Sequence, residues 1–84
     1  MREMYSIKMT NSPLEDRAKK LGKFESEFEA GLAVQKLLGW DEVFVSEDFT
    51  VNNNKTAVAC YATEEECDND RSHGAHAPWI VNHG

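Results

Sequence analysis

Cysteine, histidine and aspartate side chains gather toward the carboxyl end of the chain, where they could hold a metal ion. The cluster comprises Cys60, Cys67, Asp68, Asp70, His73, His76 and His83. Zinc binds four such ligands in a tetrahedron, so one interpretation is a zinc-binding regulatory domain. Its ligands would be Cys60, Cys67, His73 and His76.

The spacing of these residues argues against a zinc site. Zinc ligands usually come in pairs separated by about two to four residues on a turn, whereas six residues separate Cys60 from Cys67. A cysteine that faces the core from a strand behaves as a small apolar residue. Without a signal peptide, both cysteines are expected to be reduced thiols. We therefore expect no metal or cofactor, with zinc as the alternative.

Nucleophilic catalysis has one pairing to consider, which is Cys67 with His73 or His76. Such catalysis needs a nucleophile, a base within hydrogen-bond reach and a group that orients the base. The sequence does not show that these residues meet. A chain of 84 residues also leaves little room for an elaborate buried active site. We therefore expect a protein that binds rather than an enzyme.

Trp40 and Trp79 are the side chains best able to anchor a partner, since tryptophan is enriched at binding hot spots. Trp40 follows a helix-ending glycine, where an aromatic ring more often covers the core, whereas Trp79 lies in a polar tail. Acidic residues complete the candidate partner-binding set, which comprises Trp79, Trp40, Asp41, Glu42, Glu64, Glu65, Asp68 and Asp70.

The net charge is −6, from 15 acidic residues against nine lysines and arginines. Direct phosphate binding needs clustered lysine and arginine, so we expect no direct nucleic-acid binding. One interpretation of this charge is solubility, because a net charge keeps a small domain dispersed. The more specific interpretation is an acidic face that docks on a protein partner with a basic surface. With no apolar run of membrane-spanning length and no secretory signal, we expect a cytoplasmic protein that does not bind membranes.

The first half of the chain has the pattern of one strand followed by two helices. Residues 4–9 alternate between apolar and polar types, as a half-buried strand does. Pro13 and Gly22 bracket a short helix over 13–21, and a longer helix is expected over 25–38. Its apolar face would comprise Phe24, Phe28, Leu32, Val34 and Leu38, with Gly31 inside that face allowing a close approach.

The second half begins with the pattern of a sheet. Residues 42–46, 49–51 and 56–61 are rich in β-branched and aromatic residues. We expect these three strands to form an antiparallel meander, with a turn at the asparagines of 52–54.

The tail combines a short helix and a last strand. Thr63 would cap a helix that runs to about Asp70. Residues 79–81 would form a strand, which Pro78 would place at a sheet edge because proline cannot donate to a ladder. Residues 82–84 would fray.

These patterns indicate one α+β domain over residues 1–84, in which 63–84 are a less regular segment. We expect an antiparallel sheet of three or four strands, with one long amphipathic helix and a short helix on one face. Small acidic domains without catalytic motifs are common among phage accessory proteins, some of which block host defence enzymes. This analogy rests on size, acidity and the lack of motifs, not on matching residues. We interpret the chain as a non-catalytic protein-interaction or inhibitor module of that kind, acting on a host defence enzyme or a nucleic-acid-binding partner. The alternative is the zinc-binding domain, and the sequence leaves the oligomeric state open.

Overall fold

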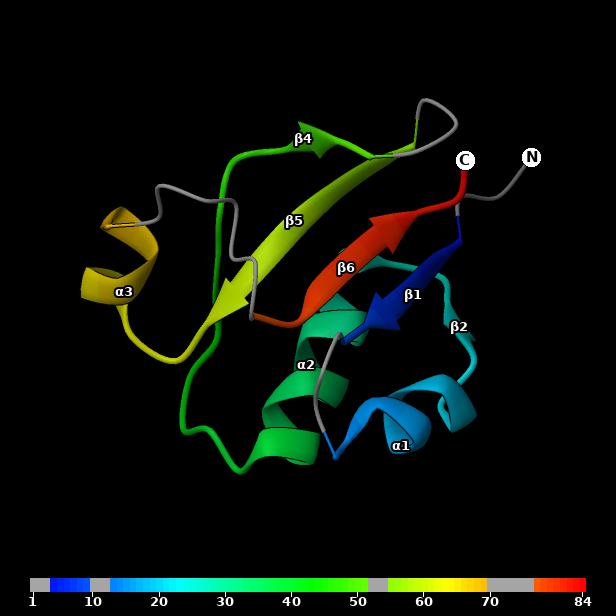
Figure 1. Cartoon of the computed structure of the whole chain (residues 1–84), viewed down its shortest axis with the longest axis horizontal. Helices are drawn as coiled ribbons and strands as arrows, with labels where there is room; N and C mark the ends of the chain where they lie inside the picture. Colours follow the sequence, from blue (N-terminus) through cyan, green and yellow to red (C-terminus); the bar gives the residue numbers. More distant parts are fainter. Residues whose placement is uncertain (1–3, 10–12, 52–54, 70–76) are drawn as a thin grey trace.

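An antiparallel sheet packed against helices forms the fold (Figure 1). The computed structural model describes residues 4–9, 13–51, 55–69 and 77–84. The α+β class and the antiparallel sheet are therefore as the sequence predicts. In chain order the elements are β1 (Tyr5–Lys8), α1 (Glu15–Lys20), β2 (Lys23–Phe24), α2 (Glu27–Leu38), β3 (Phe44–Val45), β4 (Phe49–Thr50), β5 (Thr56–Tyr61), α3 (Glu64–Asp68) and β6 (Trp79–Asn82).

The last strand, β6, lies in the middle of the sheet, whose strand order is β2-β1-β6-β5-β3. Ile80 pairs with Ile7 of β1 on one side and with Val58 of β5 on the other. The prediction of an edge position was wrong because Pro78 precedes the strand, where its missing N–H removes no bond from the ladder. Its carbonyl instead accepts a hydrogen bond from the Cys60 N–H at 2.8 Å.

Asn82 and His83 are held in place, whereas residues 82–84 were predicted to fray. Asn82 still pairs with Tyr5 and Thr56. The His83 N–H then donates to the Met4 carbonyl at 2.8 Å. The first and last described strands therefore support each other along their whole lengths.

β3 and β4 share one edge of β5, so the predicted meander was wrong. Val45 pairs with Cys60, and Phe49 pairs with Ala57, so three residues of this segment face two residues of β5. One extra residue in a strand is a β-bulge. Ser46 holds it, because its N–H donates to the Ala59 carbonyl and its Oγ accepts from the Ala59 N–H, both at 2.9 Å.

The strand count also exceeds the three or four expected, since the described residues form a six-stranded sheet. β2, β3 and β4 have two residues each, which is too short to show a periodic pattern. The predicted hairpin between β4 and β5 is present, with Val51 donating to the Lys55 carbonyl at 2.8 Å. The asparagines of 52–54 lie outside the described residues.

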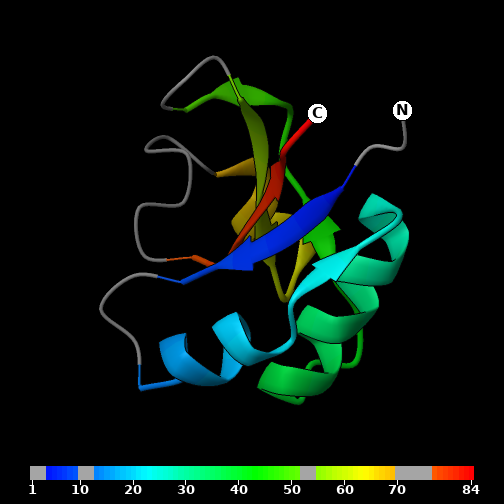
Figure 2. The ribbon, with the colours of Figure 1, turned by 90° about the vertical axis from the view of Figure 1, so that its right-hand side faces the viewer.

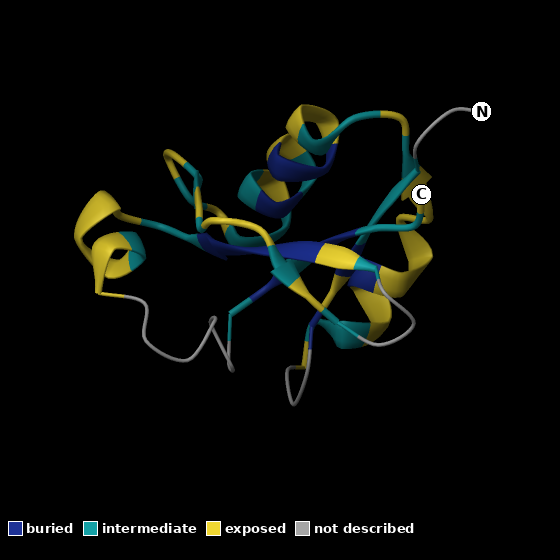
Figure 3. Cartoon of the chain, turned by 90° about the horizontal axis from the view of Figure 1, so that it is seen from above, coloured by how far each residue is buried: buried dark blue, intermediate teal, exposed yellow. Residues whose placement is uncertain are grey.

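α1 and α2 lie on the same face of the sheet (Figure 2). The buried residues of α2 are Ala30, Gly31 and Val34, whereas the side chains of Phe28 and Leu32 are exposed by 74% and 42%. Two of the five members of the predicted apolar face, Phe28 and Leu32, are therefore on the wrong side. Figure 3 shows the exposed side of α2 turned away from the sheet.

Small residues explain this orientation of α2. Ala30 is fully buried, and a Cβ placed on Gly31 would lie 3.6 Å from the Val43 side chain. α2 thus faces the core with Ala30 and Val34, and Leu37 and Leu38 also pack against it. Phe28 and Leu32 remain outside. The predicted close approach of a strand or helix at Gly31 is not found, because a Cβ there would meet only the Val43 side chain of the loop before β3, at an ordinary contact distance.

The ends of α2 follow from local chemistry. Ser26 caps the helix by accepting a hydrogen bond from the Glu29 N–H at 3.1 Å, and Glu29 Oε2 accepts one from the Glu25 N–H, one residue before the cap, at 3.3 Å. Gly39 ends the helix with a φ of 68°, a left-handed conformation that favours glycine. At α3, Thr63 accepts from the Glu66 N–H at 3.2 Å, as its predicted capping role requires.

The core lies between the helices and one face of the sheet. Its buried members are Ile7, Met9, Ala18, Ala30, Val34, Val58, Cys60 and Ile80. Among the helices of the described ranges, none combines the length and hydropathy that a bilayer span requires. The other face of the sheet is left without a described helix over it, and it contains the candidate site.

Candidate binding face

Side chains alternate along each strand, so the pairing register decides which residues share the face opposite the helices. Lys8 pairs with Trp79, and Ser6 pairs with Val81, which places all four on this face. Phe49 joins them because it pairs with Ala57, which in turn pairs with Val81. We call this surface the open face.

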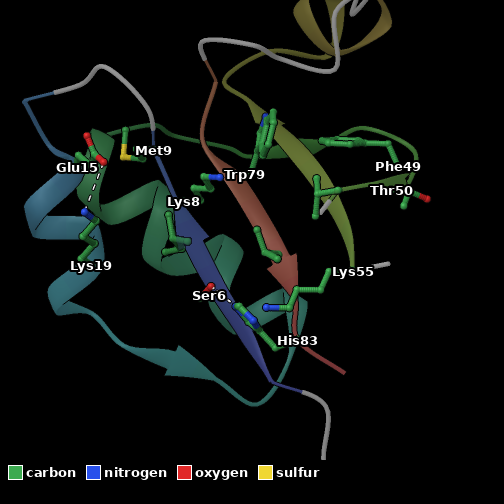
Figure 4. A pocket seen from close by; sticks show the side chains of 13 residues that line it. Ser6, Lys8, Met9, Glu15, Lys19, Phe49, Thr50, Lys55, Trp79 and His83 are labelled. Carbon is green, nitrogen blue, oxygen red and sulfur yellow. Dashed lines mark hydrogen bonds and ion pairs between the residues drawn. The ribbon is translucent and has the colours of Figure 1, made fainter. Parts of the chain in front are cut away.

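The open face is hollowed into a groove of about 860 Å³ (Figure 4). β1, β4 and β6 form its floor, and the first helix contributes one rim. The lining residues are Ser6, Ile7, Lys8, Met9, Glu15, Lys19, Phe49, Thr50, Val51, Lys55, Trp79, Val81 and His83.

Trp79 is the centre of the groove. Its ring meets that of Phe49 edge to face, with centroids 5.2 Å apart and planes at 77°, a favoured arrangement for aromatic pairs. The Nζ of Lys8 lies 5.7 Å from the centroid of the Trp79 ring, within cation–π range. Because Trp79 is only half-buried, a partner could still contact the ring that these neighbours orient.

The charge of the groove is opposite to that of the whole chain. Lys8, Lys19 and Lys55 line it, and Glu15 is the one carboxylate among the lining residues. That carboxylate is paired with Lys19, with 3.5 Å between Glu15 Oε1 and Lys19 Nζ. The groove is therefore locally cationic in a protein of net charge −6.

His83 closes one end of the groove, where its Nε2 shares a hydrogen bond of 2.5 Å with the Oγ of Ser6. Burial lowers the pKa of His83 below its usual 6.5, and the nearby charges of Lys55 and Lys23 lower it further. The imidazole is therefore neutral at neutral pH, so the positive charge of the groove comes from its lysines.

The predicted partner-binding residues do not form one surface. Trp79 lies on the open face, whereas Trp40 packs against the core on the helix side of the sheet. Asp70 lies outside the described residues. The remaining predicted acids are exposed, either in the loop after α2 or on α3, and comprise Asp41, Glu42, Glu64, Glu65 and Asp68.

The two cysteines are free thiols in different surroundings. Cys60 is fully buried in the core, and burial, followed by Glu27 and Cys67, raises its pKa to about 12. Cys67 is half-buried and donates through Sγ to the Val45 carbonyl at 3.3 Å. His73 and His76 lie outside the described residues. Within the described ranges, no three histidine, cysteine or acidic side chains come together as metal ligands.

The sequence interpretation missed most of the groove. The sequence predicts Ser6, Lys8 and Phe49 only as parts of strands and gives Lys55 no role. The signal that joins them is the register between strands distant in sequence. No family model, curated protein or solved structure matches the chain. The functional interpretation therefore depends on the geometry of the open face.

Proposed function

We propose that the protein is a small acidic, non-catalytic protein-interaction or inhibitor module of the cytoplasm that works without a cofactor. Its docking surface in this proposal is the groove of the open face. The observation that supports it most directly is Trp79, which is oriented by Phe49 and Lys8 yet remains partly exposed. Tryptophan is one of the residue types enriched at binding hot spots.

The partner that this groove fits is an acidic segment carrying an aromatic or apolar side chain. Lys8 and Lys55 would face the carboxylates of the segment, while Trp79 would contact its apolar group. Complementary charges raise association rates and select among partners. The proposed partner of the groove is therefore acidic, whereas the net charge of the chain leads to the expectation of a basic partner.

The chemistry of His83 supports binding rather than catalysis. Ser6 and His83 form a hydroxyl–imidazole pair, the same two side-chain types that serve as nucleophile and general base in a Ser-His-Asp triad. Such a system needs a carboxylate that stabilises the imidazolium, whereas the charged groups that act on His83 are Lys55 and Lys23, which destabilise it. A base with these neighbours is poorly suited to accept the hydroxyl proton.

Selection from a displayed library of random peptides at low salt tests the groove. We expect the selected peptides to be rich in aspartate and glutamate and to contain an aromatic residue. Lys8→Glu and Lys55→Glu should each weaken binding by about tenfold or more, since like charges across an interface cost ~1.4 kcal/mol or more. Binding should also weaken as salt concentration rises.

The matched control is Lys20→Glu, which makes the same charge change at an exposed position of α1 outside the groove. It should leave peptide affinity within about twofold, because remote exposed charges are screened. Selection of basic peptides, or equal losses in Lys8→Glu and Lys20→Glu, would contradict the assignment of the groove.

A second candidate surface is α3, which fits the basic partner expected from the sequence. Glu64, Glu65 and Glu66 occupy its first turn, its last turn has no basic residue, and all three glutamates are exposed. An inhibitor that blocks a host defence enzyme or a nucleic-acid-binding protein could use this surface. Replacing Glu64 and Glu65 by lysine should then abolish binding to such a partner, while Lys8→Glu should not.

A further inference from the structure

The outer side of α2 has an apolar surface that the groove does not explain. Phe28 is exposed by 74%, and Leu32, one turn later, by 42%. Burying a phenylalanine side chain is worth about 1.5–3 kcal/mol, so this exposure forgoes a large stabilisation. We call the surface formed by Glu25, Phe28, Glu29, Leu32 and Lys36 the outer face of α2.

A hollow lies beside these side chains, between α2 and β2. Its volume is about 400 Å³, and Phe24, Leu32 and Ala33 provide its apolar lining. Phe28 lies one turn before Leu32 and is therefore next to this hollow on the same surface. A protruding ring and a hollow that could receive it thus occur side by side, which is what a two-fold symmetric interface requires.

The charges of the outer face are also self-complementary. Glu25 lies just before α2 and Glu29 in its first turn, whereas Lys36 lies in its last turn. If two copies of α2 cross in antiparallel directions near the middle of the helix, Phe28 faces Leu32 of the second copy. In the same register, Glu25 faces Lys36 of the second copy.

The rim of the hollow has two acids and two lysines, namely Glu25, Glu29, Lys23 and Lys36. Two copies of a chain with net charge −6 repel each other over most of their surfaces. A face whose charges cancel is therefore a favourable place for them to meet.

We propose that the outer face of α2 binds a second copy of this chain, with the two α2 helices antiparallel about a two-fold axis. A single pair of helices buries less than the roughly 800 Å² per partner of a standard interface. The dimer should therefore form reversibly, in the micromolar to millimolar range of concentration.

Sedimentation velocity over a concentration series at low salt tests this proposal. The mass should rise from 9.5 kDa toward twice that value as concentration increases. Phe28→Asp should weaken self-association by about tenfold or more, as expected for a central apolar anchor. Val45→Asp is the matched control, because Val45 is exposed by 39% but belongs to β3.

A charge exchange tests the antiparallel register. Lys36→Glu should weaken the dimer, because it places Glu25 of the second copy opposite another carboxylate, and adding Glu25→Lys should restore it. A constant mass over the whole series, equal effects of Phe28→Asp and Val45→Asp, or failure of the double variant to recover would each overturn the proposal. Lys8→Glu should leave self-association unchanged, so failure of the groove assignment is distinguishable from failure of this one.

Discussion

The two cysteines differ in how far each thiol is buried. Thiolates, not thiols, react with alkylating agents. The pKa of Cys60 is raised to about 12 in the core, whereas Cys67 is half-buried near the end of α3. Of the two cysteines, Cys60 is therefore inert and Cys67 accessible.

Alkylation of the native protein should modify Cys67 and leave Cys60 unmodified. The measurement is mass spectrometry of peptides after a short treatment with iodoacetamide at pH 8, without and with denaturant. Both cysteines should react in denaturant, and Cys67→Ser should remove the native modification. Modification of Cys60 at the rate of Cys67 in the native protein would show that Cys60 is not buried as described.

His83 makes the stability of the fold depend on pH. Its pKa in the folded chain lies below the usual 6.5, so between these two values the unfolded chain binds more protons. The contribution of His83 to the free energy of unfolding is therefore complete above about pH 6.5. It is lost as pH falls from there through the lower folded pKa.

Urea denaturation at pH 7.5 and at pH 5.5 measures this effect. The wild-type chain should lose more stability between the two pH values than the His83→Gln variant, because glutamine does not titrate. An equal loss in the two chains would show that the pKa of His83 is not lowered by folding.

At the candidate site, the sequence pointed to Trp79, the proposed anchor, but not to its neighbours. Trp79 was selected because its residue type and its position in a polar tail favour binding. Phe49 and Lys8 meet it only through the pairing of β1, β6, β5 and β4. Register between distant strands has no local sequence signature. The sequence analysis therefore depended on net charge, which indicated a basic partner.

The orientation of α2 shows why helical periodicity was an incomplete guide. Phe28 and Leu32 repeat at the spacing of an apolar face, yet the sheet packs against Ala30 and Val34. Small residues allow a close contact that large ones would prevent. The helix therefore buries Ala30 and Val34 at its centre, and Phe28 and Leu32 lie on the outer face of α2.

Alanine substitutions distinguish the two sides of α2. Val34→Ala should lower the free energy of unfolding by about 2 kcal/mol, because it removes two methyl groups from a fully buried side chain. Leu32→Ala should change it by no more than about 0.5 kcal/mol, as is usual at the surface. Urea denaturation at micromolar concentration measures both, and the reverse order would show that the predicted face was right.

Among the strands, β5 was predicted with its observed bounds, and the others were predicted less well. β5 has six residues of strand-forming type, so its pattern is long enough to recognise. β2 has only Lys23 and Phe24 and exists because β1 lies beside it. The bulge at Ser46 splits one edge into two short strands, and a bulge has no sequence period of its own.

The whole sheet depends on β6, which joins the β2–β1 pair to the strands grouped around β5. Removing this strand would separate the two parts and expose the core residues Ile7 and Val58, which both pair with Ile80. The sequence interpretation, which placed residues 63–84 in a less regular segment, did not anticipate this role.

A chain that ends after Ala77 should therefore not fold. Its amide resonances should collapse to the narrow range of an unfolded chain in a two-dimensional NMR spectrum. A chain that ends after His83 should retain the dispersed spectrum, because it keeps β6 and the bond from His83 to Met4. A dispersed spectrum from the shorter chain would show that β1 and β5 can assemble without β6.

Charge is distributed unevenly over the molecule. Cations concentrate in the groove of the open face, while α3 is exposed and acidic. A single net charge therefore describes neither surface. The protein offers two faces of opposite sign, and each would select a different partner.

The pairing of β1 with β6 also determines how the chain reaches this structure. Ser6 and His83, which bond to each other, are 77 positions apart. Closing so long a loop costs chain entropy before any contact rewards it, and proteins dominated by distant pairings fold slowly. α2, with 12 residues, is too short to be stable alone in water. Folding should therefore be a single slow step. During synthesis, β1 should not pair with the centre of the sheet until β6 has left the ribosome.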